Sequence, residues 1–391
     1  MVVAHQRFGD KLEALTIGEK TMAQTGTVIP QGLNLRETPG GTVITMLPQG
    51  ATVEILEDQG DFLKVDANGQ VGFVAARFIQ RGASGAGASG AGASAGGSFH
   101  FEGNKAVAPD GTVFGKKFQL GIFNVGDTSI ADFVGANQAA FPNLSASRLR
   151  VMSAVSVNEG KLEAINTFDN AFLTFGCFQW TAGSGDAAGE LPAMANHLKQ
   201  TDATGFDQLL GQFGLDIASV NSPAGQTPTG FFSLNGAVIK TAADKQSKLR
   251  TLEMAFRFFS AGKDSRMRQA EVEYAASRID LFYRDANHKI RNLFIADFVS
   301  SEFGVALILD EHVNRPGHVP GTLTGAVNQF ITATGKTDPS TWTTQDEAGL
   351  LNVYIQRRNS TSMTDSQNRA NRIRQAVNNG LASDARGSFQ P

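Results

Sequence analysis

The stretch NEGKLEAINTFDNAFLTFGCFQW, residues 158–180, decides the fold of the carboxy-terminal part of the chain. The residues before it, 145–157, place apolar side chains at a helical spacing. Within the stretch, apolar and polar residues partly alternate and Asp169–Asn170 is a turn signal, which predicts a short β-hairpin. Gly160 directly follows Glu159, and a glycine there is typical of a left-handed helix cap. We therefore expect a helix that ends at Glu159 and leads into a hairpin.

Helical periodicity dominates the chain beyond this stretch. Apolar residues recur on one face at a spacing of three to four positions, as in an amphipathic helix. These patterns predict helices over residues 245–262, 266–286, 292–313 and 365–381. Residues 98–140 have mixed periodicity that includes the strand-like FQLGIFNVG, and from there on only the interval around 165–182 reads as β. We expect residues 98–391 to form one α-rich (α+β) domain with a short β-hairpin.

The composition excludes several classes of function. The chain has 391 residues, 34 basic and 37 acidic side chains and a formal net charge of −3, so no overall field favours nucleic acid or an anionic membrane. Its one cysteine, Cys177, excludes an intramolecular disulfide and a multi-cysteine zinc site. No apolar run has the length of a membrane span, and the start, MVVAHQRFGDKLEAL, has no signal-peptide pattern. We expect synthesis in the cytoplasm, two or three domains, and no metal or organic cofactor.

Residues 82–97, GASGAGASGAGASAGG, contain only Gly, Ala and Ser. Such a segment cannot bury enough apolar area to offset the entropy lost on ordering. We therefore expect a flexible linker between two independently folded domains. Residues 1–25 precede the first of them as a leader, which includes the amphipathic RFGDKLEALTIGEK. This leader is either featureless or a docking or loading signal.

Residues 26–81 have the pattern of a small all-β domain. Five short runs alternate apolar and polar residues and are separated by glycine-containing turns, which predicts a small barrel. The string LNLRETPGGTVITMLPQGATVEILEDQGDFLKVDANGQVGFVAARFI, residues 33–79, closely resembles the bacterial Src-homology-3-like (SH3-like) domain. This resemblance implies a wall-targeting or anchoring module. Phe62 and Phe73 stand where that family often has tryptophan.

Glu159 and Asp169 are the candidate catalytic residues. A carboxyl group at a helix end with apolar neighbours is partly desolvated, which raises its pKa toward the value that a general acid needs. A hairpin after Glu159 would hold Asp169 across a cleft from it, with Thr174 on the return strand. Two carboxylates that flank a groove are the minimum equipment for hydrolysing a glycosidic bond. We therefore predict Glu159 as the general acid, Asp169 as the base or electrostatic stabiliser, and Thr174 as the residue that orients water.

The same interval resembles the active-site region of the lysozyme-like superfamily, in particular the phage-type lysozymes. Glu159–Gly160, Asp169 and the TFGCFQ that begins at Thr174 carry the resemblance. Those enzymes have eight residues between Glu and Asp and five between Asp and Thr, where this chain has nine and four. The following WTAGSGDAAGEL, residues 180–191, resembles the chitosanases, which share the lysozyme-like fold and match the Asp-to-Thr spacing. Both resemblances imply an inverting or lysozyme-type hydrolase of a polymer that contains glucosamine units.

Four further residues are candidates for binding the substrate. Gln179 is predicted to hydrogen-bond the sugar. Trp180 is predicted to stack on a sugar ring, with packing in the core as the alternative. Asp186, in the loop GSGD, is a candidate sugar contact, with a solvated turn as the alternative. His312 is a candidate for lining the cleft, and because the histidines and carboxylates around it match no metal-site spacing, no metal is predicted.

These features together predict a peptidoglycan hydrolase, a muramidase that cleaves glycosidic bonds of the bacterial cell wall. Its substrate would be peptidoglycan or a related glucosamine-containing polysaccharide, reached in the periplasm or outside the cell after lysis or injection. A phage endolysin and an effector of a contractile injection system are both compatible, the latter with delivery machinery and an immunity protein as partners. The alternatives are a chitosanase-like hydrolase and a non-catalytic cell-wall-binding protein.

Overall fold

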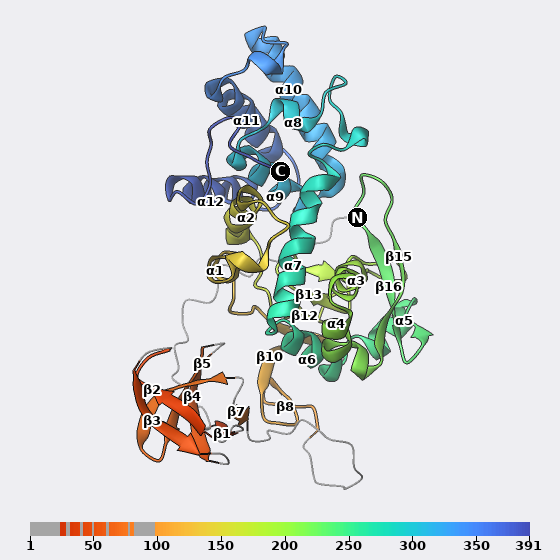
Figure 1. Cartoon of the computed structure of the whole chain (residues 1–391). Coiled ribbons are helices and arrows are strands. Elements are labelled where there is room, and N and C mark those ends of the chain that lie inside the picture. The colour runs from red at the N-terminus through yellow and green to blue at the C-terminus, as the bar shows by residue number, and fades with distance from the viewer. Residues whose placement is uncertain are drawn as a thin grey trace. The chain divides into compact units, whose positions relative to one another are not determined.

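The computed structural model describes residues 24–28, 32–39, 42–48, 51–59, 62–76, 79–81 and 98–391. These residues fall into two compact units, the amino-terminal strands up to Arg81 and the unit 98–391, and each has its own hydrophobic core (Figure 1). The predicted linker 82–97 and all but the last two residues of the predicted leader lie outside the described residues. None of the helices in the described part has the length and apolar character needed to span a membrane.

The amino-terminal unit is an antiparallel sheet. Its strands are β1 (Gln24–Val28), β2 (Gly32–Arg36), β3 (Val43–Pro48), β4 (Thr52–Asp58), β5 (Phe62–Ala67), β6 (Gln70–Ala75) and β7 (Ile79–Arg81), in the spatial order β3-β2-β6-β5-β4-β1-β7. Side chains along β5 alternate between buried and half-buried, and Leu63 and Val65 point into the core. The all-β prediction is confirmed, although there are more strands than the five expected and β1 begins before the predicted boundary at residue 26.

A second antiparallel sheet runs through the first part of the unit 98–391. Its strands are β8 (His100–Glu102), β9 (Lys105–Val107), β10 (Val113–Phe118), β11 (Gly121–Asn124), β12 (Ile165–Asn166), β13 (Thr174–Phe175) and β14 (Trp180–Thr181), and their spatial order follows the sequence. Between β11 and β12 the chain forms two helices and returns so that Asn124 pairs with Ile165. The predicted hairpin is present as β12 and β13, and the structure adds β14 on one side and β8–β11 on the other.

A third sheet contains β15 (Leu215–Asn221), β16 (Thr229–Leu234) and β17 (Ala237–Val238). The prediction that a single β interval interrupts the helices after Ser145 is therefore wrong. Most side chains of β15 are exposed or half-buried, so its sequence LDIASVN does not show the strong alternation of apolar residues that marks a strand packed on a core. This weak pattern explains why the sheet was missed.

The helices of the unit 98–391 are α1 (Ile130–Ala136), α2 (Ala146–Val155), α3 (Leu191–Thr201), α4 (Ala203–Leu209), α5 (Ala242–Lys248), α6 (Leu252–Ala261), α7 (Ser265–Ser277), α8 (Ile295–Phe298), α9 (Glu302–Asn314), α10 (Val319–Thr334), α11 (Thr344–Asn359) and α12 (Ser366–Asn378). Short 3-10 turns lie at η2 (Gln138–Ala140), η3 (Ser156–Asn158), η4 (Gly211–Phe213), η5 (Arg278–Leu281), η6 (Ala286–His288), η7 (Pro316–His318) and η8 (Pro339–Thr341).

Two of the predicted helices are each divided by a capping residue. The helix predicted over 245–262 is divided into α5 and α6, because the Thr251 side chain accepts the backbone N–H of Met254 over 3.0 Å and starts a new helix. The helix predicted over 292–313 is divided into α8 and α9 by Ser301, which caps α9 in the same way. The remaining two correspond to α7 with the following 3-10 turn and to α12.

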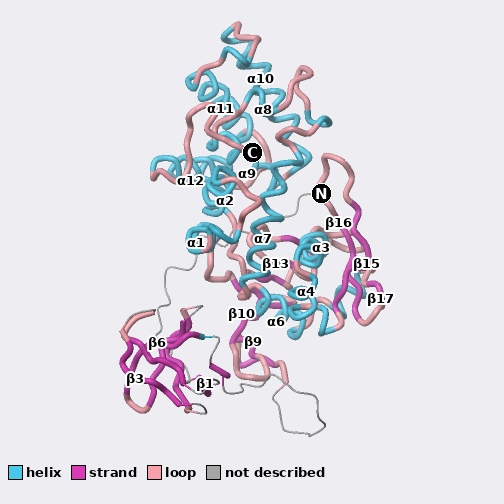
Figure 2. Tube along the Cα trace, viewed as in Figure 1, coloured by secondary structure: helices cyan, strands magenta, loops and turns pink. Residues whose placement is uncertain are grey.

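Helix α7 connects two groups of elements within this unit. In Figure 1 it runs from the group α8–α12 to the part that holds the sheets and α3–α6, and Figure 2 shows that strands are confined to the second group. In the first group α9 is central, with all side chains from Glu302 to His312 buried. Helix α2 packs against both α7 and α9, so its carboxy-terminal end lies where the two groups meet.

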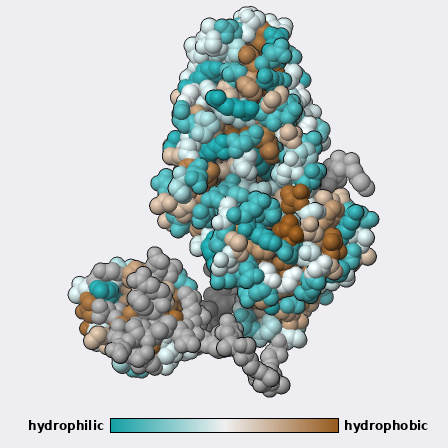
Figure 3. Space-filling model, turned by 45° about the vertical axis from the view of Figure 1, so that its right-hand side comes forward, coloured by the Kyte–Doolittle hydropathy of each residue, from teal (hydrophilic) through white to brown (hydrophobic). Residues whose placement is uncertain are grey.

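The surface of this unit is mainly polar. The face in Figure 3 is mostly hydrophilic, and its apolar residues form small separate groups. Among the large apolar side chains of the described residues, the most exposed is Leu120, at 76%, in the turn between β10 and β11. Isolated exposed apolar residues of this kind are ordinary on a folded domain.

Candidate active site

Glu159 lies just beyond the end of α2. The helix is followed by the 3-10 turn Ser156–Asn158, after which Glu159 takes an extended conformation. The prediction that Gly160 caps the helix is wrong, because the cap residue is Ser156 and Gly160 does not have a positive φ. The backbone N–H of Gly160 instead donates to the Cys177 carbonyl over 2.8 Å. Glu159 is thereby held against the turn between β13 and β14.

This turn, Gly176–Gln179, approaches Glu159 closely. Gly176 and Gln179 both have positive φ, at 80° and 55°. The Gln179 side chain donates to the Gly176 carbonyl over 3.0 Å, and a Cβ atom added to Gly160 would lie 2.8 Å from Gln179 Nε2. A side chain at position 160 would therefore displace the Gln179 side chain. The arrangement places Gln179, a predicted substrate-binding residue, beside the backbone that carries Glu159.

The carboxyl group of Glu159 is buried and ion-paired. Its side chain is 7% exposed and binds the guanidinium group of Arg369 on α12. Burial is the main cause that raises the pKa of Glu159 to about 7; the Arg369 charge opposes this rise, and the neighbouring Asp310 carboxylate adds to it. A carboxyl group with this pKa is partly protonated at neutral pH, as a general acid must be.

Arg369 belongs to a network that fixes its position. It donates to Asp310 over 2.6 Å and to the Asn158 carbonyl over 3.0 Å. Arg358, whose side chain is fully buried, binds the second oxygen of Asp310 over 2.9 Å. Two guanidinium groups thus face two carboxylates, so the network is neutral when Glu159 is ionised and positive when Glu159 is protonated. The network therefore stabilises the ionised form of Glu159 against burial.

Asp169 lies in the loop between β12 and β13. Its two carboxylate oxygens accept hydrogen bonds from Asn166 Nδ2 and from the Ala171 backbone N–H, each over 2.9 Å. The short strand β13 separates this loop from the turn Gly176–Gln179 that touches Glu159. No hydrogen bond or ion pair of the described residues joins Asp169 to Glu159. That Asp169 faces Glu159 across a cleft stays a prediction, and the contacts present assign it a local role in the loop.

Thr174 and Trp180 are buried on the paired strands β13 and β14. Thr174 is 3% exposed and its hydroxyl has no hydrogen-bond partner among the described residues. Trp180 is 1% exposed, with its ring 5.7 Å from that of Tyr274 and 5.8 Å from that of Phe178. The core-packing alternative therefore describes Trp180, and a sugar cannot stack on its ring in this conformation.

Asp186 lies in an exposed loop that is tied to α5. Its Oδ1 atom accepts the backbone N–H of Ala242, at the first turn of that helix, over 2.7 Å. From inside the loop, the buried Lys245 donates to the carbonyls of Gly183, Gly185 and Ala187 over 3.1, 3.0 and 2.5 Å. These contacts give Asp186 a structural role in the loop, and its contact with a sugar stays a prediction.

His312 is buried, and its contribution to a cleft stays a prediction. It is 3% exposed and packs against the Phe282 ring on the inner side of α9. Burial, together with the nearby Arg278 charge, lowers the pKa of His312 to about 3 and keeps the imidazole neutral. The adjacent Glu311 binds Arg315 and Thr322 over 2.6 and 2.9 Å. In the part of the chain that the structure describes, no group of three or more His, Cys, Asp or Glu side chains could hold a metal.

Glu271 of α7 is a site residue that the sequence did not reveal. Its Oε2 atom accepts the Cys177 backbone N–H over 3.1 Å, and a Cβ atom added to Gly176 would overlap it. Burial raises the pKa of Glu271 well above its usual range. Like Arg369 and Asp310, it appears in the sequence only as a polar position on a predicted helix, and its neighbours are decided by tertiary packing.

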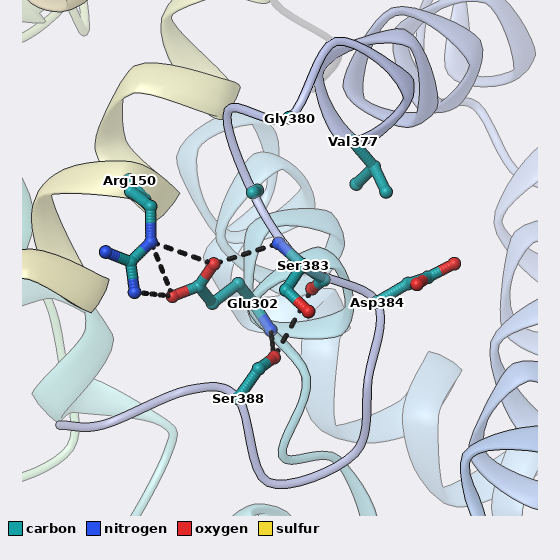
Figure 4. A pocket seen from close by; sticks show the side chains of 8 residues that line it. Arg150, Glu302, Val377, Gly380, Ser383, Asp384 and Ser388 are labelled. Carbon is teal, nitrogen blue, oxygen red and sulfur yellow. Dashed lines mark hydrogen bonds and ion pairs between the residues drawn. The ribbon is translucent and has the colours of Figure 1, made fainter.

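The pocket in Figure 4 lies elsewhere in the unit and is lined by Arg150, Glu302, Val377, Gly380, Ala382, Ser383, Asp384 and Ser388. The buried carboxylate of Glu302 accepts hydrogen bonds from the Arg150 guanidinium group over 2.6 Å and from the Ser383 backbone N–H over 2.9 Å. These bonds attach the carboxy-terminal tail to α2 and α9. A second pocket is lined by Leu293, Ala296, Asp297, Asp338, Pro339, Ser340 and Arg386. Neither pocket includes a predicted site residue.

Comparisons with known proteins bear on the amino-terminal unit. A family model described as bacterial SH3 domain matches residues 31–80. The match confirms the SH3-like prediction for this unit and does not extend into residues 98–391. No curated protein and no solved structure matches the chain.

Proposed function

We propose that this chain, whose amino-terminal unit is a bacterial SH3 domain, is a peptidoglycan hydrolase with Glu159 as its general acid. The observation that carries the proposal is the environment of Glu159, whose buried carboxyl group has a pKa of about 7 and lies beside the turn Gly176–Gln179. The sequence around it resembles the active-site interval of lysozyme-like enzymes.

The surroundings of Glu159 suit both states of an acid catalyst. Burial keeps a fraction of the carboxyl group protonated at neutral pH, so it is able to give a proton to the glycosidic oxygen as that bond breaks. After the transfer, the carboxylate is stabilised by Arg369, which is already in contact with it. Gln179, whose side chain lies next to Gly160, is proposed to hydrogen-bond the sugar.

The bacterial SH3 domain supports the choice of the cell wall as substrate. A wall-binding module and a catalytic domain on one chain raise the effective concentration of the enzyme at the bonds it cleaves. The enzyme would act in the periplasm or outside the cell, after lysis by a phage or delivery by an injection machine, and delivery would call for an immunity partner. A chitosanase-like activity is the second reading of the same resemblance.

A non-catalytic wall-binding protein is the alternative from another class. Two observations favour it: Glu159 is ion-paired with Arg369, and Thr174 is buried. Both make these proposed catalytic side chains less accessible to a substrate.

The decisive experiment measures reducing ends released by the full-length protein from purified peptidoglycan and, in parallel, from chitosan. We expect release from peptidoglycan and a loss of roughly 100-fold or more in Glu159→Gln, the scale usual for a general acid. Glu253→Gln is the matched control, because Glu253 is 60% exposed on the outer face of α6. Release from chitosan alone would change the substrate, and no release from either polymer, with wall binding retained, would establish the non-catalytic alternative.

A further inference from the structure

Among the described residues, burial raises the pKa of three carboxyl groups, those of Glu159, Glu190 and Glu271. Glu271 is 0% exposed, so no substrate or bulk water reaches it. The side chains of Glu159 and Glu190 remain 7% and 13% exposed. Only these two therefore combine a raised pKa with contact to solvent.

A single arginine acts on both of these carboxyl groups. Arg278, in the 3-10 turn that follows α7, binds Glu190 directly. Its charge also acts on Glu159, whose pKa it lowers. The Arg278 side chain is 6% exposed, and it donates to the His312 carbonyl over 3.3 Å. The same buried guanidinium group thus contacts Glu190 and acts on Glu159 through its charge, whereas among the described residues no hydrogen bond or ion pair joins Glu159 to Asp169.

Two buried polar atoms around this arginine, Arg278 Nε and Trp180 Nε1, lack a hydrogen-bond partner within the described residues. The Glu190 carboxyl group and the Tyr274 hydroxyl face each other, and their contact lowers the pKa of Glu190 and raises that of Tyr274. The side chains are neighbours, since the ring of Phe178 is 5.9 Å from the Arg278 guanidinium and 5.8 Å from the Trp180 ring, which in turn packs on Tyr274. Buried polar atoms normally find partners, so a group of unpartnered ones calls for an explanation. Water or substrate hydroxyl groups would satisfy them.

Backbone and loop contacts hold Glu190 in place. It precedes α3 directly, and Gly189 pairs with Gly230 of β16 through two backbone hydrogen bonds of 3.0 and 2.7 Å. The loop before it is fastened by Lys245. Such a position on rigid elements is what a catalytic side chain requires.

We propose that Glu190 is the second catalytic carboxylate of the enzyme, acting as the base opposite the acid Glu159. This inference rests on the proposed glycosidase function. Glu159 gives its proton to the glycosidic oxygen and the bond from that oxygen to the anomeric carbon breaks. Glu190 takes a proton from a water molecule whose oxygen bonds to the anomeric carbon. The products are two sugar chain ends, with Glu159 ionised and Glu190 protonated until a proton returns.

The charged neighbours of Glu190 make its titration assignable. Burial together with the Glu190 charge raises the pKa of Tyr274 well above its usual range. On α9, His312 is neutral because its pKa is lowered to about 3. Further out, His197 on α3 pairs with Glu273 on α7 over 3.2 Å and stacks near Tyr274. The acidic limb of a pH–rate profile is thus expected to report Glu190.

The test compares full-length Glu190→Gln, Glu159→Gln and Glu253→Gln for sugar release from peptidoglycan between pH 4 and 9. We expect Glu190→Gln to lose about 100-fold and its remaining activity to lack the acidic limb, as for removal of a general base. Glu253→Gln, the exposed control on α6, should stay within about threefold of wild type at every pH, because Glu253 is 60% exposed. In Glu190→Ala, added formate should restore part of the rate by replacing the missing carboxylate.

Two results would overturn the assignment of Glu190. One is a Glu190→Gln enzyme as active as wild type while Glu159→Gln is inactive, which leaves the proposed function intact. The other is a loss of the same factor at every pH with no rescue of Glu190→Ala by formate, which would make the residue structural. Inactive wild type would instead reject the proposed function itself. If Glu190→Gln fails to fold, Glu190→Asp keeps the charge for Arg278 and must still lower the rate.

Discussion

At the scale of single residues, the proposed chemistry of this protein depends on whether the Glu159 carboxyl group is protonated or ionised. Burial alone would keep its carboxyl group protonated, and Arg369 alone would keep it ionised. Their opposition leaves the pKa at about 7, within reach of either state. An acid catalyst acts only while it is protonated, so we expect activity to fall as the pH rises through about 7.

Replacement of Arg369 by methionine tests this balance. Because the Arg369 charge lowers the pKa of Glu159, its removal should raise that pKa and shift the alkaline limb of the pH–rate profile to higher pH. The neighbouring Asp310, left with Arg358 as its only arginine, would add to the shift. Arg372→Met is the matched control, since Arg372 lies on the same helix and binds Asn158 and Asp365 but not Glu159. An unshifted limb in Arg369→Met would show that another group titrates there.

The sequence identified Glu159 but not its partners. A glutamate at the end of an apolar helical pattern is recognisable because the pattern is local. Arg369 is 210 positions away along the chain, and nothing in the residues around it distinguishes it from other arginines of α12. For Trp180 the sequence left sugar stacking and core packing open, and its packing against Tyr274 and Phe178 puts it in the core.

At the scale of elements, the site depends on the turn between β13 and β14. Gly176 has a φ of 80°, and its Cα faces the Glu271 carboxyl group and the Trp180 ring so closely that no side chain fits. The hydrogen bond from Cys177 to Glu271 then fixes the turn against α7. In this way a long helix of the core determines where Gln179 and the Glu159 backbone lie.

Gly176→Ala should therefore destabilise the unit 98–391 by more than the cost of forcing an alanine into a left-handed backbone conformation. Gly380→Ala is the control, because Gly380 has a similar φ of 76° and no atom within 4 Å of an added Cβ. We expect Gly380→Ala to cost about 1 kcal/mol and Gly176→Ala about 1–3 kcal/mol more, as overpacking does. The measurement is urea unfolding followed by tryptophan fluorescence, since both tryptophans, Trp180 and Trp342, are buried in this unit. Equal costs would mean that the turn moves away freely.

At the scale of the whole molecule, the two units have separate cores. The strands of the bacterial SH3 domain bury one cluster that includes Leu63 and Val65, and the unit 98–391 buries another around α9. Domains with independent cores unfold as independent units unless an extensive interface couples them. The proposed division of labour, with binding in one unit and cleavage in the other, relies on this independence.

Leu63→Ala separates the two units experimentally. Its fully buried side chain belongs to the core of the SH3 domain, so its truncation should cost that unit roughly 2–5 kcal/mol. We expect the thermal transition of the SH3 domain and binding to cell walls to be lost first, while the tryptophan fluorescence transition stays unchanged. Val71→Ala, at a 45% exposed position on β6, should leave both transitions in place. A fluorescence transition that moves with Leu63→Ala would show that the units unfold together.

The sequence by itself determined the features that depend on neighbouring residues. These are the all-β pattern of the SH3 domain, the amphipathic helices α7 and α12, the hairpin of β12 and β13, and a glutamate at the end of α2. Tertiary structure alone decided the joining of β11 to β12, the ion pair of Glu159 with Arg369, and the ion pair of Glu190 with Arg278. The reason is that periodicity records which face of an element is buried, whereas the charge of a buried carboxyl group depends on what the rest of the chain places against it.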